Sequence, residues 1–545
     1  MKKSILLLLS ILCIFSCKTT KNYTSITLSS KASLVTKKTQ LKSKKNWHLK
    51  DIETDTLPGI SLNRSYATIL KNKRGKDIII AVIDTEVDIH HKDLQNTIWV
   101  NESEIPNNGI DDDKNGYIDD VYGWNFLGNK KGENNRFINF EYTRILKQTS
   151  KDFKNLTPKD AVLKNEKKLQ LHNRAKEAYD KRMQIDSAGK ANYDKLYTLY
   201  FEAKNKIYPY LKERVFNQKS VDSLKKLKPE GINDFHFFIW SDCLKNNIND
   251  ALVTKYRDNA NERINKMLNL AYNDRSIQGD NENDISDTDY GNNNVSGNID
   301  FLEHGTKMAG IIANITKNTT IKIMPIAISA YGDENDKDIA LAIRYAVDNN
   351  AKVINMSFGK EFSTHKKWVD DAIKYAEKNN VLIVSSAGNF GNNLNIESHY
   401  YPNDRGEKDS NISDNFLLIG ASTYTLNKKL KAKNSNYGNI DVDLFAPGTN
   451  IFTTNTQNRN TFSGGTSSAA AITSGVAALL YAYYPSLNAS QIKSILMNSG
   501  IAYTIPVSTP EKDDKSKLTP FNQLSKSGKI LNAYNAFIMA EKITK

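Results

Sequence analysis

The chain has 545 residues, of which 39% are apolar and 25% charged, and its formal net charge at pH 7 is +14. This composition excludes a disordered or fibrous protein, and a chain of this length can bury a large core in one or several domains. The lysines are dispersed among asparagine and glutamate, without the clustered arginine and aromatic residues of a nucleic-acid surface. We therefore expect a globular protein with long solvated segments and no nucleic-acid partner.

The N-terminus is typical of an exported protein. Two lysines precede an almost entirely apolar stretch, Ser4 to Ser16, which is too short to span a bilayer as a mature helix. The residues leading to Cys17 resemble a bacterial lipobox, although Phe15 is bulkier than the usual residue there. We interpret residues 1–16 as a signal peptide and expect an acylated Cys17 to anchor the chain to a membrane of the bacterial cell envelope, facing the periplasm or the outer surface. Ordinary cleavage and an uncleaved anchor are the alternatives.

Residues 17–46 combine the lipidated cysteine with a segment rich in lysine, serine and threonine, which predicts a flexible tether. Folded sequence is expected from Trp47 onward, beginning with a short helix at 65–71. Of the three cysteines, Cys243 has no partner once the other two are removed with the leader or acylated. No disulfide is therefore expected, and a lone thiol of this kind is typically buried and inert.

The main body of the chain alternates between strand and helix patterns. A run of β-branched residues at 78–83 predicts a parallel strand that is buried on both faces, and Asp84 follows it at a place where open α/β sheets carry their sites. Further strands are expected at 321–328, 352–356, 381–385 and 416–421, with helices at 339–349 and 368–378. This alternation predicts an α/β fold with a doubly wound, mostly parallel sheet.

A loop rich in aspartate and asparagine follows at 108–120. Its oxygen-bearing residues have the odd-position spacing of a calcium loop, namely Asp111, Asp113, Asn115, the carbonyl of Tyr117 and Asp119. The twelfth position is Tyr122 instead of the bidentate glutamate of such loops. A structural calcium ion and a plain acidic turn both remain open at this stage.

Residues 129–287 differ in composition from their surroundings and predict a helical insertion. A lysine- and glutamate-rich helix opens with Pro158 at its first position and is expected to end near Asp186, with further helices at 193–210 and 261–273. An aromatic cluster is more typical of a small core than of a ligand site, and it comprises Phe235, Phe237, Phe238 and Trp240. The parts on either side, 47–128 and 288–545, would form one domain.

Three segments carry side chains suited to nucleophilic or acid–base chemistry. Gly464 and Gly465 precede Ser467 at the start of an apolar helix, where free N–H groups favour an oxyanion, although helix capping is the ordinary role of such a serine. His304 opens a second helix of small residues and has a pKa suited to a general base, although a lone histidine is more often structural. Asn389 follows a strand, and its amide can donate to an oxyanion or only stabilise a turn.

The order Asp84, His304, Ser467 is that of the subtilisin form of the catalytic triad. Four motifs resemble those of the subtilisin-like serine peptidases, and they lie at 81–85, 304–310, 386–389 and 465–469. The resemblance covers roughly residues 60–129 and 291–545. Because the four motifs occur in the family's order, the resemblance is far more specific than any one of them.

The resemblance implies a role for each matched residue. Ser467 would be the nucleophile, His304 its general base and Asp84 the group that orients the imidazole, while Asn389 and the N–H of Ser467 would form the oxyanion hole. A polypeptide substrate would lie extended between two edges, Ser357-Phe358-Gly359 and Ser386-Ala387-Gly388. The implied activity is that of a serine endopeptidase, which requires no cofactor for its chemistry.

The sequence departs from the family pattern at a few positions. Glu86 stands where a glycine is usual, so we expect either backbone strain or a carboxylate charge that raises the pKa of the histidine. Lys307, Ser468 and Ala471 replace a usual histidine, methionine and proline and would alter packing more than chemistry. Two alternatives remain, a catalytically degenerate module that binds extended peptides at the cell envelope and a scaffold protein built around the insertion.

Overall fold

The computed structural model describes residues 27–28 and 44–545, except 154–157, 212–216, 228, 301–302, 397–398 and 407–409. The expected leader, the lipidation site Cys17 and most of the expected tether therefore lie outside the described residues. Among the residues that are described, no helix is both long and apolar enough to cross a membrane.

A ten-stranded sheet runs through the main domain in the order β1-β11-β14-β8-β7-β6-β5-β2-β4-β3. All neighbouring strands are parallel except β11 and β14. The strands are β1 (Thr27–Leu28), β2 (Ile79–Asp84), β3 (Trp124–Asn125), β4 (Lys322–Ala327), β5 (Val353–Met356), β6 (Leu382–Ser386), β7 (Phe416–Ser422), β8 (Leu444–Pro447), β11 (Ile501–Tyr503) and β14 (Lys529–Ile530). The predicted doubly wound, mostly parallel sheet is confirmed, and the expected strands lie within about two residues of their observed bounds.

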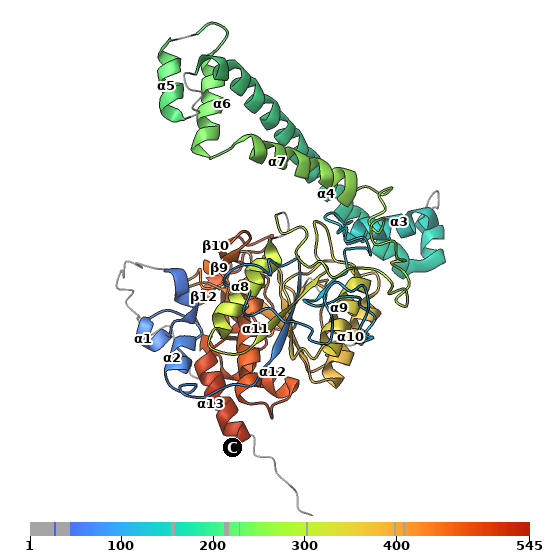
Figure 1. Ribbon diagram of the computed structural model, residues 1–545, viewed down its shortest axis with the longest axis vertical. Helices are drawn as coiled ribbons and strands as arrows, with labels where there is room; N and C mark the ends of the chain where they lie inside the picture. Colours follow the sequence, from blue (N-terminus) through green and yellow to red (C-terminus); the bar gives the residue numbers. More distant parts are fainter. Residues whose placement is uncertain are drawn as a thin grey trace, which may run out of the picture.

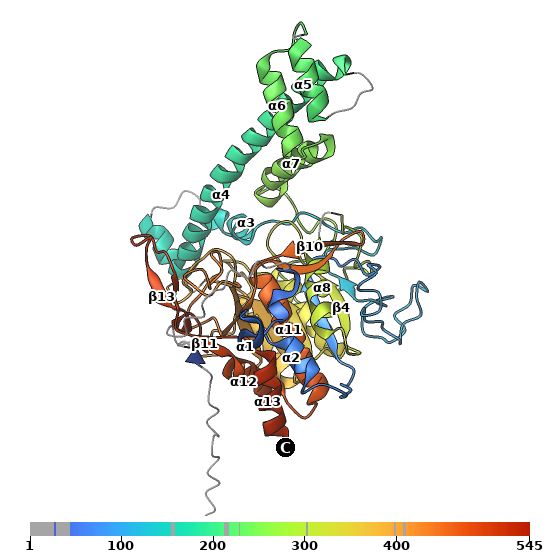
Figure 2. The same ribbon diagram turned by 90° about the vertical axis from the view of Figure 1, so that its left-hand side faces the viewer.

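Helices cover both faces of this sheet (Figures 1 and 2). One core lies beneath α8 (His304–Thr316), α11 (Thr466–Tyr483), α12 (Ala489–Ser499) and α13 (Ala533–Thr544). The core of the other face lies beneath α9 (Asp336–Asp348) and α10 (Lys366–Lys378). Because helix α11 is buried at nearly every position, its sequence is apolar all round.

Small residues allow helix α8 to pack closely, as its sequence predicts. A Cβ atom on Gly310 would lie 2.1 Å from Thr454 Oγ1, and a Cβ on Gly475 of α11 would lie 2.7 Å from Ile315. Both contacts would clash with any larger residue. Helix α8 is therefore packed closely against strand β9 and against helix α11.

The folded part begins slightly before the expected position. A 3-10 helix, Lys44–Leu49, buries Trp47, whose indole N–H donates to the Thr449 carbonyl at 2.8 Å. The short helices α1 (Ile52–Asp55) and α2 (Leu62–Ala67) follow, so the helix expected at 65–71 begins and ends earlier. Two residues of the expected tether form β1 beside β11. Two antiparallel hairpins complete the main domain, β9 (Ile451–Asn455) with β10 (Arg459–Ser463), and β12 (Pro506–Ser508) with β13 (Leu518–Pro520).

The insertion projects from the main domain as an arm of helices (Figure 1). It comprises α3 (Glu141–Phe153), α4 (Pro158–Ile207), a 3-10 turn (Tyr208–Tyr210), α5 (Gln218–Leu227), α6 (Asp234–Lys245), α7 (Asp250–Glu262) and a π turn (Arg263–Met267). Helix α4 begins at Pro158 as predicted, is kinked at Asn165, whose backbone is extended, and continues past the end expected near Asp186. The helix expected at 261–273 is wrong beyond Met267, because Asn269 turns the chain by accepting the Ala271 amide at 2.8 Å.

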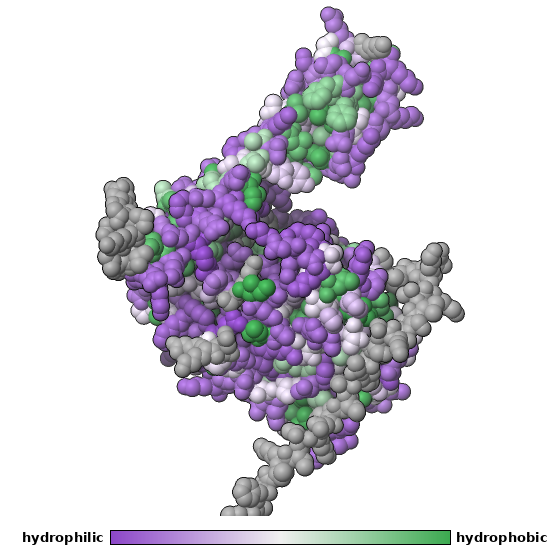
Figure 3. All heavy atoms as spheres, turned by 180° about the vertical axis from the view of Figure 1, so that it is seen from behind, coloured by the Kyte–Doolittle hydropathy of each residue, from purple (hydrophilic) through white to green (hydrophobic). Residues whose placement is uncertain are grey.

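The outer part of the insertion has a core of its own. Phe237, Trp240 and Cys243 are buried in it, which confirms the expected small core and the buried thiol, and burial raises the pKa of the Cys243 thiol. The other two aromatic residues of the cluster are instead 50% exposed (Phe235) and 63% exposed (Phe238). Figure 3 shows apolar residues gathered on this outer part, whereas the surface of the main domain is mostly hydrophilic.

Buried ion pairs join the base of the insertion to the main domain. Arg144 of α3 pairs with Glu141 at 2.7 Å and with Asp274 at 3.0 Å. Lys360, just after β5, pairs with Asp336 of α9 at 2.8 Å and with the same Glu141 at 3.2 Å. Helix α3 is thereby fixed beside the segment that follows strand β5.

Candidate active site

The topology brings several predicted site residues to one edge of the sheet. Strand β2 lies between the parallel strands β4 and β5, so the carboxyl ends of the three strands meet at one edge of the sheet, where sheets of this kind carry their sites. Asp84 ends β2, Ser357 follows β5, and Asn389 follows β6. Helix α11 begins beside this edge and carries Ser467 in its first turn.

Asp84 and His304 form a direct pair. The Nδ1 atom of His304 lies 2.8 Å from one carboxylate oxygen of Asp84 and 3.0 Å from the other. The side chain of Asp84 is only 2% exposed, whereas that of His304 is 41% exposed. With the Nδ1 proton directed to Asp84, the Nε2 atom is left as the proton acceptor of the exposed imidazole.

The backbone around this pair is fixed by Thr85. Its N–H donates to Asp84 Oδ1 at 2.7 Å, and its hydroxyl oxygen accepts the N–H of Gly305 at 2.7 Å. A Cβ atom at Gly305 would lie 2.3 Å from the Thr85 carbonyl, so this close approach of α8 to the end of β2 requires glycine. Gly305 thus permits the close contact that brings His304 next to Asp84.

The pKa of His304 is raised above its usual value. Burial acts in the opposite direction, but the charge of Asp84 and its hydrogen bond outweigh burial. Of the more distant charges, Lys307 lowers this pKa and Glu334 raises it. The resulting imidazole is a stronger base than a free histidine.

Ser467 stands at a sharp backbone turn into helix α11. Gly465, two residues before it, has a φ of 101°, which side-chain-bearing residues rarely adopt. The hydroxyl of Ser467 donates to the Ser357 carbonyl at 3.0 Å, and the Ser357 hydroxyl donates back to the Ser467 carbonyl at 3.1 Å. Among the described residues, Ser467 Oγ has no hydrogen bond to His304, so in this conformation its proton is held by the edge after β5.

Asn389 is oriented by the residue that precedes the serine. Its amide oxygen accepts from the N–H of Thr466 at 2.9 Å and from the hydroxyl of Thr466 at 3.3 Å. Its side-chain nitrogen has no hydrogen-bond partner within the described chain, and the residue is exposed. An amide donor therefore remains available next to the N-terminus of helix α11.

The two expected substrate edges lie side by side. Ser357, Phe358 and Gly359 follow β5, while Ser386, Ala387 and Gly388 continue from β6, the strand paired with β5. The Ser386 hydroxyl donates to the Phe358 carbonyl at 3.4 Å, which links one edge to the other. The two segments that are predicted to bind the substrate therefore lie next to each other in the structure.

The structure contradicts both expectations for Glu86, which were backbone strain and a carboxylate charge that raises the pKa of the histidine. Its backbone is not in the left-handed region, so there is no strain of that kind. Its side chain is only 1% exposed. The carboxylate accepts hydrogen bonds from the side-chain amides of Asn125 at 3.1 Å, Asn134 at 3.0 Å and Asn298 at 3.3 Å. It also accepts the backbone N–H of Asn298. The carboxylate therefore faces asparagines at the two ends of the insertion, and it is not among the main charges that act on His304. Burial raises the pKa of Glu86, and these hydrogen bonds offset the shift in part.

The other departures from the family pattern are accommodated by packing. Lys307 forms an ion pair with Glu303 on its own helix. Ser468 is fully buried and donates to the hydroxyl of Ser463 on β10 at 3.0 Å, and Ala471 is fully buried in the core. Within the described part of the chain, none of the three side chains forms a hydrogen bond with the Asp84–His304 pair.

The acidic loop brings several carboxylates close together, and one of them, Glu104, was not predicted from the sequence. Oxygen atoms of Glu104, Asp111 and Asp113 lie within 4.8 Å of one another. Glu104 precedes the loop and is 5% exposed, and its Oε2 atom is buried without a partner in the described chain. Asp119 instead accepts two backbone amides of the loop at 3.1 and 2.9 Å, and Asn115 accepts the N–H of Tyr117 at 2.8 Å. Only a burial pattern, which the sequence does not give, would have pointed to Glu104.

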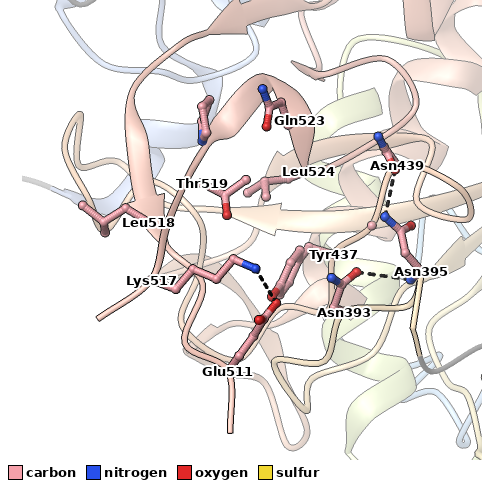
Figure 4. Close-up of a pocket in the computed structure, with 12 residues that line it drawn as sticks. Asn393, Asn395, Tyr437, Asn439, Glu511, Lys517, Leu518, Thr519, Gln523 and Leu524 are labelled. Carbon is pink, nitrogen blue, oxygen red and sulfur yellow. Dashed lines mark hydrogen bonds and ion pairs between the residues drawn. The ribbon is translucent and has the colours of Figure 1, made fainter. Parts of the chain in front are cut away.

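A separate cavity of about 430 Å³ lies near the C-terminal hairpin (Figure 4). Asparagine amides line one side of it, and the amide of Asn395 donates to Asn439 at 2.8 Å. An ion pair between Lys517 and Glu511, 2.7 Å long, lies on the other side. This cavity contains none of the predicted catalytic residues.

Comparison with known proteins agrees with the motifs. The model of the Subtilase family matches residues 75–526. The thermophilic serine proteinase of Bacillus sp. strain AK1 is 35% identical over 191 residues, which are 33% of this chain and 43% of that protein. The cell wall-associated protease of Bacillus subtilis strain 168 is 34% identical over 221 residues, 38% of this chain and 23% of that protein.

Subtilisin DY of Bacillus licheniformis is 30% identical over 211 residues, which are 37% of this chain and 72% of that protein. The chain spans less than half the length of the first two relatives. Since the family model matches most of the chain and the site residues stand in the family's order, this chain belongs to the subtilase family.

Proposed function

We propose that this protein is a serine endopeptidase whose catalytic residues are Asp84, His304 and Ser467. The observation that carries the proposal is the pairing of His304 with both oxygens of a buried Asp84, beside the turn that begins helix α11 with Ser467. A buried carboxylate that fixes the imidazole tautomer leaves Nε2 as the base, and the helix N-terminus favours negative charge at the serine. Membership of the subtilase family supports the same assignment.

The proposed reaction follows from these positions. His304 Nε2 takes the hydroxyl proton of Ser467 while the Oγ atom of Ser467 attacks the carbonyl carbon of the scissile bond. The oxyanion of the tetrahedral intermediate accepts from the N–H of Ser467 and from the free amide of Asn389. Collapse breaks the C–N bond, His304 returns its proton to the leaving amine, and water then hydrolyses the acyl-enzyme on Ser467 with the same histidine as base.

Substrate binding is proposed to release the nucleophile. An extended peptide that pairs with the edge Ser357-Phe358-Gly359 would donate a backbone N–H to the Ser357 carbonyl. That carbonyl now accepts the hydroxyl of Ser467 at 3.0 Å, so the peptide would compete with it. Rotation about one side-chain bond would then direct the hydroxyl to His304.

The test is labelling of the full chain with an active-site fluorophosphonate, together with cleavage of an unfolded polypeptide. The wild-type chain should be labelled on Ser467, and Ser467→Ala should take up no label while keeping the same circular dichroism spectrum. Absence of both labelling and cleavage in a folded wild-type chain across the neutral and alkaline range would contradict the enzyme assignment. The binding-only alternative rested on Glu86, and the orientation of that side chain removes its support.

We also propose a structural calcium site on the acidic loop. Carboxylate oxygens are the ligands that calcium prefers, and the unpaired buried oxygen of Glu104 fits a cation held with Asp111 and Asp113. The ion would supply no step of catalysis and would stabilise the loop beside β3. Calcium should raise the melting temperature of the full chain and a chelator should lower it, and Glu104→Gln should abolish this difference. Equal melting temperatures with and without calcium would leave the loop as a plain acidic turn.

Export and lipid anchoring are proposals from the first residues of the sequence alone. Mass spectrometry of the mature N-terminus in a bacterial host should find an acylated Cys17, and Cys17→Ser should release the chain from the membrane fraction. An unmodified N-terminus at another residue would dismiss the anchor.

A further inference from the structure

The slot between the two substrate edges is filled by a tyrosine. A Cβ atom on Gly359 would lie 2.2 Å from Tyr400 Oη and 2.3 Å from Tyr400 Cζ, and a Cβ on Gly388 would lie 2.7 Å from Tyr400 Cε2. The tip of the ring therefore contacts both edges at once. Tyr400 is 5% exposed, so its ring is packed against these two glycines.

The backbone around Tyr400 is held on one side by the edge after β5. Lys360 and Tyr401 exchange two backbone hydrogen bonds, of 2.9 and 2.8 Å, directly beside it. Lys360 is itself buried and paired with Asp336 at 2.8 Å. The segment that carries the tyrosine is thereby fixed to the segment that carries Gly359, and the ring cannot leave the slot by a simple shift of its loop.

The other side of the slot is fixed by Asn436. Its amide donates to the Ala387 carbonyl at 2.8 Å, and its backbone N–H donates to the Gly388 carbonyl at 2.9 Å. A Cβ on Gly388 would lie 2.6 Å from the same amide nitrogen. Both walls and the residue between them therefore form one packed unit.

Tyr400 also borders a cavity of about 720 Å³ between helix α4 and the main domain. Arg174 and Lys181 of α4 line it on one side, and Phe362, Phe390 and Tyr400 line it on the other. Gly359 borders this cavity, but Gly388 does not. Tyr400 thus borders both the slot and an open space that is large enough for an aromatic side chain.

We propose that Tyr400 determines specificity by closing this slot, so that the enzyme cleaves after residues with small side chains, namely glycine, alanine and serine. The inference rests on the proposed peptidase function and on a substrate that lies between the two edges. A methyl group fits against the tip of the ring, whereas a leucine or phenylalanine side chain would have to displace a packed aromatic residue.

The test uses the full chain and peptide substrates that differ only in the residue before the scissile bond: glycine, alanine, leucine or phenylalanine. Wild type should show kcat/KM for alanine at least about 100-fold above that for phenylalanine, since pocket size discriminates by factors of this order. Tyr400→Gly should join the slot to the adjacent cavity and raise kcat/KM for phenylalanine by about 100-fold. The matched control, Tyr400→Phe, keeps the ring and should keep the preference for alanine.

The outcomes separate this inference from the function on which it rests. A wild-type chain that is labelled by fluorophosphonate but cleaves after leucine or phenylalanine as fast as after alanine overturns the role of Tyr400 and leaves the peptidase function intact. A folded wild-type chain that takes up no label overturns both. If Tyr400→Gly does not fold, the preferences of wild type and Tyr400→Phe decide the matter without it, because a ring-closed slot must reject large residues in both.

Discussion

At the scale of single residues, the contact between His304 and Asp84 accounts for the raised pKa of the histidine. Its Nδ1 atom lies within 3.0 Å of both oxygens of Asp84, and the raised pKa comes from that carboxylate acting against burial. In the proposed mechanism the base is the neutral imidazole, so activity is expected to be lost as the pH falls through this pKa and to be present above it.

A pH profile tests this arrangement. The kcat/KM of wild type should rise with pH with a midpoint above about 6.5, the ordinary pKa of histidine. Asp84→Asn should lower this midpoint and reduce kcat by about 10⁴-fold, the size of loss that this change causes in a serine protease triad, because the amide stabilises the wrong tautomer. A midpoint that does not move in Asp84→Asn would contradict the role of this carboxylate.

Glu86 is a second residue whose role depends on its partners. Three asparagine side chains and one backbone amide donate to its buried carboxylate, and two of these asparagines, Asn134 and Asn298, lie at opposite ends of the insertion. Glu86→Ala should lower the free energy of unfolding by about 2–3 kcal/mol, because the buried amide of Asn125 and the partly buried amides of Asn134 and Asn298 lose their acceptor.

Urea denaturation of wild type and Glu86→Ala measures this loss. The exposed Glu53 offers a matched control on the surface, and Glu53→Ala should change stability by less than about 1 kcal/mol although its carboxylate bonds Arg64 at 2.7 Å. Equal losses for the two variants would show that Glu86 does not hold the insertion in place.

At the scale of elements, helix α3 is joined to the main domain by charge. Glu141 contacts two buried cations, Arg144 at 2.7 Å and Lys360 at 3.2 Å. Burial tends to raise the pKa of Glu141, but the charges of Lys360 and Arg144 outweigh it and lower this pKa to about 2. Because folding lowers the pKa of Glu141, its ion pairs with Arg144 and Lys360 stabilise the fold above about pH 4.5. This stabilisation is lost as the pH falls toward 2 and Glu141 becomes protonated.

Removing one partner of this buried group should be costly. Glu141→Gln should lower the free energy of unfolding at pH 7 by about 3–5 kcal/mol, because two buried cations lose a compensating charge. Asp180→Asn removes the exposed i,i+4 partner of Lys176, 2.7 Å away, and should cost less than about 0.5 kcal/mol. Chemical denaturation of both variants at pH 7 gives the comparison, and a cost for Glu141→Gln as small as that of the control would contradict the structural role of the ion pairs.

At the scale of the whole molecule, the outer part of the insertion has a hydrophobic core separate from those of the main domain. Its buried residues form a cluster separate from the two cores that cover the sheet. The base of α4, in contrast, packs with α3 and Phe362 of the main domain, through residues such as Ala175 and Tyr179. The boundary between the independent and the joined part therefore falls within helix α4.

Truncation tests this boundary. Replacing residues 187–258 by a short glycine-serine turn should leave the fluorophosphonate labelling of Ser467 unchanged, because the base of α4 and the ion pairs of α3 remain. Deleting 129–287 in full should give an insoluble chain, since it removes Glu141, one of the two carboxylates paired with the buried Lys360, and leaves Glu86 without Asn134 as a donor. Loss of labelling in the shorter deletion would show that the outer helices support the active site.

The sequence alone determined the elements whose patterns are local. Buried parallel strands such as 79–84 and 382–386 are continuous apolar runs, so their positions could be predicted to within about two residues. The order of Asp84, His304 and Ser467, together with the glycines around them, identified the family and its candidate catalytic residues. These features depend on each segment's own side chains, which are read directly from the sequence.

The tertiary structure decided everything that depends on which side chains meet across long separations. The sequence could not show that Glu86 turns toward Asn134 and Asn298, that Glu104 joins the acidic loop, or that the insertion is fixed by buried ion pairs. It could not show that Tyr400 occupies the slot between Gly359 and Gly388, because these residues approach one another only when the sheet is assembled. Charge and shape complementarity between distant segments are properties of the packed molecule, and no local pattern encodes them.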